Sequence, residues 1–254
     1  MKIEEYLKSL PQTVMSGNDI QLPDHSFEEM FTFAGLSKED TFYHLGCGDG
    51  SGLKIALEKF NVKRVIGVDS DQNKIKQAQE KLQKVSLADV TLECNDIRTV
   101  DIIQGAVILF WFTDDKIITD MMQKFEKLDN CRIITIWGPL PNCLPDMVKF
   151  PYIICKTPFK KMTDIKDQVK AIFGVDCIDF VTAWENAELY THAIEPINSE
   201  NDRFLTILQT INIWINARNM GVACGKEIPL PIKTYMRILE EHFGIEVEHL
   251  LNDK

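Results

Sequence analysis

The fold of this chain is decided by residues 43–52, which read YHLGCGDGSG. An apolar strand pattern precedes this stretch at 41–45, and a helical pattern follows it at 53–60. Glycines at such a junction let the backbone turn tightly and come close to a ligand. The N-terminus of the following helix adds partial positive charge and free N–H groups. We therefore expect a ligand-binding loop between a strand and a helix.

Strand and helix patterns continue to alternate along the chain after this loop. The segment 106–112 is apolar on both faces and is expected in the centre of the sheet. The alternation predicts an α/β fold with a doubly wound parallel sheet and helices on both faces. The other strands are expected at 64–69, 89–93 and 132–137, and the other helices at 27–34, 74–84 and 114–128.

The pattern changes after Gly138, where four prolines follow within a short stretch. We expect an insert at 139–175, which is locally basic because 149–170 holds six lysines and two acidic residues. Residues 176–184 and 188–194 flank Glu185-Asn186-Ala187 and predict a β-hairpin. On this basis residues 1–195 are expected to form one domain.

A helical extension is expected at 196–254. Its first helix has an apolar stripe that includes Phe204, Leu208 and Trp214, and a last helix is expected near 232–243. Such a stripe has to be buried. It could pack on the first domain, cover a substrate site, or form a homodimer through the C-terminal helices.

Composition and charge narrow the classes of function. The 254 residues include 38 acidic and 28 basic ones, a net charge of −10, which disfavours nucleic-acid binding because phosphates are repelled. The longest apolar run, 107–112, is far too short to cross a membrane. The seven cysteines form no CxxC pair, and the chain starts with MKIEEYLK rather than an export signal. We expect free thiols and a cytoplasmic location.

The glycine spacing separates the ligand classes that use such a loop. Gly46 and Gly48 match the dinucleotide pattern GxGxxG, but Ser51 takes the place of the third glycine, and the GK[ST] of a P-loop is missing. Asp69 ends the second strand, where a carboxylate can accept the hydroxyls of a ribose. A nicotinamide-dependent oxidoreductase fits the distance to Asp69 but not Ser51.

With its GxGxG spacing the sequence resembles the class I S-adenosylmethionine-dependent methyltransferases. The string LGCGDG is a common form of their first motif, VIGVDSD at 65–71 resembles the second, and Asn95-Asp96-Ile97 resembles the third. Within this family, residues 21–50 and ILFWFTDD at 108–115 look most like archaeal-type protein lysine methyltransferases. The resemblance implies a Rossmann-like seven-stranded sheet with an antiparallel closing hairpin.

The resemblance also implies a cofactor site on the loops after the first four strands. Gly46, Cys47 and Gly48 are expected to line the methionine and ribose, and Asp69 is expected to hold the ribose hydroxyls. The adenine is expected to contact Ser70, Asp96 and Ile97. Phe110 and Trp111 are expected beside the sulfonium, where aromatic faces attract a cation by roughly 0.5–2 kcal/mol. Trp111 and Phe112 would also line the acceptor channel, and Asp114 either orients the acceptor or only caps the next helix.

His44 departs from the pattern of the family. An acidic residue usually stands at this position and helps to hold the amino group of the cofactor. A neutral histidine can accept one hydrogen bond, whereas a protonated one repels an ammonium group. The remaining histidines show no metal-ligand spacing, so we expect no metal site.

The function implied by the resemblance is methyl transfer from S-adenosylmethionine to a lysine of a protein. Two alternatives stay open at this point. One is a small-molecule methyltransferase, in which the C-terminal helices close a pocket. The other is an inactive methyltransferase-like scaffold that binds a partner, with His44 as the mark of a decayed site.

Overall fold

The structure is a computed structural model that describes residues 22–83, 85, 89–112, 114–194 and 202–247. The chain divides into two compact units, and the boundary between them lies between Met162 and Thr163. The expected boundary after residue 195 differs from this one, because the helices of the second unit begin earlier than the sequence pattern suggested.

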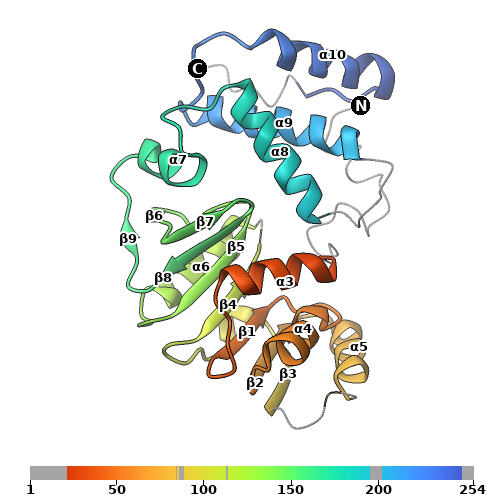
Figure 1. The fold of residues 1–254 in the computed structure, drawn as a ribbon, viewed down its shortest axis with the longest axis vertical. Coiled ribbons are helices and arrows are strands. Elements are labelled where there is room, and N and C mark those ends of the chain that lie inside the picture. The colour runs from red at the N-terminus through yellow and green to blue at the C-terminus, as the bar shows by residue number, and fades with distance from the viewer. Residues whose placement is uncertain (1–21, 84, 86–88, 113, 195–201, 248–254) are drawn as a thin grey trace. The chain divides into compact units, whose positions relative to one another are not determined.

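A seven-stranded sheet forms the first unit, with the strand order β3-β2-β1-β4-β5-β8-β7 (Figure 1). Neighbouring strands from β3 to β5 are parallel, and β8 runs antiparallel to both of its neighbours. The expected fold class is confirmed, and β4 lies in the centre of the sheet as predicted. The strands are β1 (Thr41–Leu45), β2 (Arg64–Asp69), β3 (Asp89–Cys94), β4 (Val107–Phe110), β5 (Arg132–Ile136), β7 (Met147–Lys149) and β8 (Tyr152–Lys156).

Helices connect the parallel strands and cover the sheet. The strand order reverses between β1 and β4, and right-handed crossovers then place α4 and α5 on one face and α6 on the other. Aromatic contacts fix both layers, with Phe31 of α3 against Phe42 at 4.9 Å and Phe125 of α6 against Phe110 at 5.2 Å between ring centroids. The helices are α3 (Asp24–Phe33), α4 (Ser51–Phe60), α5 (Gln72–Leu82), α6 (Asp115–Phe125) and the short 3₁₀ helix η1 (Ile97–Thr99).

The closing hairpin lies at 147–156 and not at 176–194. Strand β8 carries the run Tyr152-Ile153-Ile154-Cys155, which is fully buried. Pro151 lies in the turn between β7 and β8, where a missing N–H costs no ladder hydrogen bond. The prolines suggested an insert, but the segment supplies the last two strands of the sheet. The strands β6 (Cys143–Leu144) and β9 (Lys160–Lys161) pair with each other in a separate two-stranded antiparallel sheet.

The expected hairpin at 176–194 is wrong, because most of this segment is helix α8 (Phe180–Ile194). The side chain of Asp179 caps the helix by accepting a hydrogen bond from the Thr182 amide at 2.8 Å. Buried positions recur at Ala183, Ala187 and Tyr190, which is helical spacing. The β-branched and aromatic residues of this segment, such as Val181, Thr182 and Trp184, produced the false strand signal.

The second unit consists of helices and buries its own apolar stripe. Helix α9 (Asp202–Asn219) packs on α8 and on α10 (Leu230–Phe243), and Trp214 of α9 is completely buried. Phe204 of α9 contacts Phe243 of α10 with ring centroids 5.0 Å apart. The short helix α7 (Ile165–Phe173) precedes them. The apolar stripe is thus covered within the unit, and homodimerisation stays a prediction. Among the described helices none is long and apolar enough to span a membrane.

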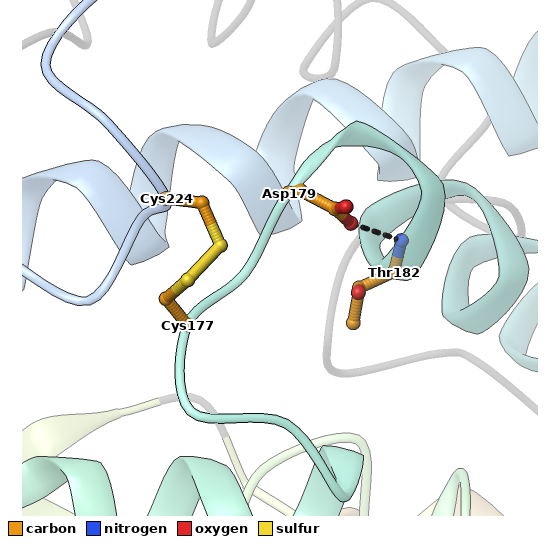
Figure 2. The surroundings of a disulfide bond; sticks show 4 residues. All are labelled: Cys177, Asp179, Thr182 and Cys224. Carbon is orange, nitrogen blue, oxygen red and sulfur yellow. Dashed lines mark hydrogen bonds between the residues drawn. A yellow bond between two sulfur atoms is a disulfide. The ribbon is translucent and has the colours of Figure 1, made fainter.

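A disulfide joins Cys177 to Cys224, so the expectation that all thiols are free is wrong (Figure 2). The bond links the segment before α8 to the segment after α9, 47 residues apart in sequence. Backbone hydrogen bonds beside it hold the same two segments together, from the Cys224 amide to the Ile178 carbonyl at 2.8 Å and from the Ile178 amide to the Val222 carbonyl at 2.9 Å. The pairing depends on the packing of helices and has no signature in the spacing of cysteines.

We expect replacement of Cys177 by serine to destabilise the helical unit by about 2–4 kcal/mol in non-reducing buffer, because the unfolded chain regains the freedom that the cross-link removed. Chemical denaturation with and without dithiothreitol measures this difference. In reductant the variant and the parent should unfold alike. The exposed free thiol Cys94 provides a matched control as Cys94→Ser. Equal stability of both proteins in non-reducing buffer would show that this disulfide contributes nothing.

Candidate functional site

The candidate site lies at the carboxyl ends of the parallel strands, where the strand order reverses. The loop after β1 carries the glycines, and the segment after β4 lies next to it because β1 and β4 are paired. Parallel pairing also brings the end of β2, with Asp69, to the same edge. This edge is where open α/β sheets bind their ligands.

The glycine loop turns sharply around the end of β2. The amides of Gly46 and Cys47 both donate to the carbonyl of Val68, at 2.8 and 2.9 Å. Gly46, Gly48 and Gly50 have φ values of 77°, 55° and 81°, which only glycine adopts readily. A methyl group on Gly48 would meet no atom within 4 Å, so the space above this residue is open. The loop therefore offers bare backbone to a ligand.

The carboxylate of Asp69 holds this loop in place. Its Oδ2 accepts a hydrogen bond from the Gly48 amide at 2.9 Å, and its Oδ1 accepts one from the Asp71 amide at 2.9 Å. Asp71 in turn caps α5 through the Asn73 amide at 2.7 Å. Asp69 is nearly buried, with 9% of its surface exposed, while Ser70 beside it is exposed. The carboxylate sits where it can also accept a ligand hydroxyl, because each of its oxygens has a second lone pair.

His44 lies beneath the loop in apolar surroundings and is only 8% exposed. Its ring contacts Phe27 edge-on at 5.8 Å, and a methyl group on Gly52 would come within 2.9 Å of its Nδ1. Burial lowers the pKa of His44 to about 4, although the nearby Asp49 carboxylate acts in the opposite direction. The imidazole is therefore neutral near pH 7. Its Nδ1 has no hydrogen-bond partner among the described residues.

The thiol of Cys47 is buried beside the loop. It is 3% exposed and lies against Gly67, where a methyl group would come within 3.0 Å of its sulfur. Burial raises the pKa of this thiol to about 12, and the Asp69 carboxylate adds to the effect. A thiol that stays protonated is a poor nucleophile. Cys47 contributes backbone and a small buried side chain.

Asp96 and Ile97 follow β3 at the same edge of the sheet. The Asp96 carboxylate caps η1 through the Arg98 amide at 2.9 Å, and both of its oxygens accept hydrogen bonds from the Arg98 guanidinium. These hydrogen bonds lower the pKa of Asp96 to about 2, so it is ionised at neutral pH. Ile97 is buried, with 6% exposure. Both residues follow β3, as the motif predicts. The Asp96 carboxylate, however, already binds the Arg98 guanidinium.

The segment after β4 brings Phe112 to the glycine loop, although the sequence predicts Phe110 and Trp111 beside the sulfonium and Phe112 in the acceptor channel. Phe110 is 2% exposed and packs in the core on Phe125, so its ring is not open to a ligand. Phe112 lies over the loop instead, since a methyl group on Gly46 would come within 3.0 Å of its ring. Trp111 between them is half-buried. Only the tertiary packing distinguishes these three neighbouring aromatic residues.

Asp114 is exposed and caps α6, because its Oδ1 accepts a hydrogen bond from the Ile117 amide at 2.9 Å. The structure thus shows the capping role that the sequence left open. A role in orienting the acceptor stays a prediction.

A further cation belongs to the site and was missed by sequence reasoning. The Nζ of Lys81, near the end of α5, contacts the Asp49 carboxylate and lies 2.6 Å from the Ser51 hydroxyl. Both partners belong to the glycine loop and the start of α4. Nothing in the sequence pairs residue 81 with residue 49, since α5 presents several lysines of equal appearance.

The donor set of the site fits a cofactor that carries a nucleoside. Backbone amides around Gly48 border open space, and the Asp69 carboxylate at its edge suits ribose hydroxyls. The aromatic ring of Phe112 on the other side suits a soft cationic centre. The site therefore combines a polar end for a sugar with an aromatic end for a positive charge.

Comparison with known families gives a match to a model described as a methyltransferase domain, over residues 42–128. The chain is also similar to a protein-lysine N-methyltransferase of Saccharolobus islandicus, with 27% identity over 110 residues that cover 42% of this chain and 67% of the relative. An uncharacterised protein of Methanocaldococcus jannaschii is 44% identical over 57 residues. That match covers 22% of this chain and only 25% of the relative.

Solved structures resemble parts of the chain at low identity. An RNA methyltransferase from Salinibacter ruber in complex with S-adenosyl-L-homocysteine gives a TM-score of 0.48 at 21% identity, covering 53% of this chain and 90% of the other. The magnesium protoporphyrin IX methyltransferase from Synechocystis gives 0.38 at 16% identity, covering 46% and 59%.

Because the pKa of His44 falls from its ordinary 6.5 to about 4 on folding, the unfolded chain binds a proton in this range that the folded chain does not. Stability should therefore fall as the pH drops from 6.5 to 4, by about 3 kcal/mol from this group alone, and be unaffected by it above 6.5. The variant His44→Gln should show a shallower decline when denaturation curves are compared across this range. Parallel declines in both proteins would contradict a buried neutral His44.

Proposed function

We propose that this chain, which belongs to the class I S-adenosylmethionine-dependent methyltransferases, transfers a methyl group to lysine side chains of a protein. The observation that carries the choice of acceptor is the similarity to a protein-lysine N-methyltransferase over 110 residues. The resemblance of the segment 108–115 to the archaeal-type lysine methyltransferases supports the same choice.

S-adenosylmethionine, when bound, supplies an electrophilic methyl carbon on a positively charged sulfur. The Asp69 carboxylate would hold the ribose, and the amides around the open space at Gly48 would lie along the methionine and ribose. Phe112, which lies against Gly46, would face the sulfonium. Fixing the donor in this way leaves the acceptor nitrogen to be aligned, and alignment at about 3–3.5 Å accounts for much of the catalysis in a displacement.

A lysine acceptor has to lose its proton before its nitrogen can attack. Half-buried aromatic rings at Trp111 and Phe112 would line an apolar passage for the side chain. Such surroundings disfavour the ammonium form and lower the pKa of the lysine. The proton would then leave to solvent, with the exposed Asp114 carboxylate near the entrance as an attractive group for the incoming cation. The net charge of −10 favours approach of a lysine-rich protein in general.

The proposal is tested by incubating the purified chain with S-adenosylmethionine and a lysine-rich protein, followed by mass spectrometry. We expect mass increases of about 14 Da on lysine side chains, one increment for each methyl group that replaces a hydrogen. The same protein with acetylated lysines is the matched control and should gain nothing. Methylation of small amines with no product on any protein would favour the small-molecule alternative and overturn the proposal.

Trp111 provides the second test of the acceptor. We expect Trp111→Ala to lower methylation of lysine at least tenfold while leaving the affinity for S-adenosylmethionine within about threefold, because the ring lines the passage and not the nucleoside site. Trp111→Phe keeps an aromatic wall and should retain most of the rate. Rates and calorimetric affinities of the three proteins are compared. Unchanged methylation in the alanine variant would mean that the ring has no part in the passage.

A further inference from the structure

Helix α5 contacts the glycine loop at two separate points. At its N-terminal end, Asp71 caps the helix and donates its amide to Asp69, which in turn holds Gly48. At its C-terminal end, Lys81 reaches across to Asp49 and Ser51. Both ends of α5 therefore contact the glycine loop or the residue that holds it.

Between these two points the loop lies directly on the helix. Gly50 has a φ of 81°, and a methyl group on it would come within 2.9 Å of the Ala78 Cβ and 3.1 Å of its Cα. Neither atom can move aside without moving the backbone of α5. Any shift of the loop relative to α5 would therefore change the contacts of Lys81 as well.

Asp49 joins the cation to the backbone of the loop. Its Oδ1 accepts a hydrogen bond from the Ser51 amide at 3.0 Å, and its Oδ2 contacts the Lys81 ammonium. The side chain of Asp49 is 19% exposed and that of Lys81 is 31% exposed, so water screens this pair less than a surface pair. Removing the cation would take this contact away from the Asp49 carboxylate, and loss of an ion-pair partner is unfavourable for a partly desolvated charge.

We propose that Lys81 is a positioning residue for the cofactor, which acts through Asp49 and Ser51 to keep the glycine loop in its binding conformation. Lys81 itself need not touch the ligand. The open space above Gly48 exists only while the loop is held at these φ values. Lys81 contacts the loop region at Asp49 and Ser51, whereas Asp69 contacts it at Gly48. This inference depends on cofactor binding at the glycine loop and is independent of the nature of the methyl acceptor.

The test measures binding of S-adenosylhomocysteine by calorimetry, together with hydrogen exchange of the loop amides. We expect Lys81→Met to raise the dissociation constant about tenfold, and the amides of residues 46–50 to exchange faster while those of β1 and β4 are unchanged. Lys81→Arg should recover most of the affinity, because a cation on a long side chain is retained. Lys76→Met removes an exposed lysine from the same helix and is the matched control.

A double-mutant cycle shows whether Lys81 acts through Asp49. If it does, Lys81→Met should cost little further affinity in an Asp49→Asn background. Additive losses, or an equal loss in Lys76→Met, would overturn the inference. A lower melting temperature with an unchanged dissociation constant would also overturn it, since it would show a structural role alone. If the parent protein bound neither S-adenosylmethionine nor S-adenosylhomocysteine, the proposed function would be wrong. If the parent binds and Lys81→Met binds equally well, only the inference about Lys81 is wrong.

Discussion

The carboxylate of Asp69 is the constraint on which the binding edge of the sheet depends. It ends β2, accepts the amide of Gly48 from the loop after β1, and accepts the amide of Asp71 at the start of α5. One nearly buried group thus connects two strands and a helix. The same carboxylate fixes the loop that borders the open space over Gly48 and is the group proposed to accept the ribose hydroxyls.

The electrostatics of the loop follow from this arrangement. Lys81 balances the charge of Asp49 on one side, while His44 beneath the loop is kept neutral by burial. A neutral imidazole at this position would not repel the ammonium group of a methionine-type ligand. The departure from the acidic residue usual in the family therefore does not by itself oppose cofactor binding near pH 7.

The second unit is organised by a different principle. Its helices bury apolar residues such as Trp214 against one another, and a disulfide between Cys177 and Cys224 joins the segments that flank α8 and α9. This unit accounts for the apolar stripe that the sequence left without a partner. It also explains why the compact boundary lies at Thr163, ahead of the expected domain end.

The sequence by itself determined the parts that rest on local pattern. Alternating apolar runs located the five parallel strands, and the glycines of residues 46–50 with Asp69 pointed to the edge of the sheet that carries the candidate site, because glycine conformation and strand ends are local properties. Tertiary structure alone decided the rest. Prolines near β8 and β-forming residues in α8 made their sequence patterns misleading. Packing also decided that Phe112 rather than Phe110 contacts Gly46. The contact of Lys81 with Asp49 and the Cys177–Cys224 bond join residues far apart in sequence, and only packing brings such groups together.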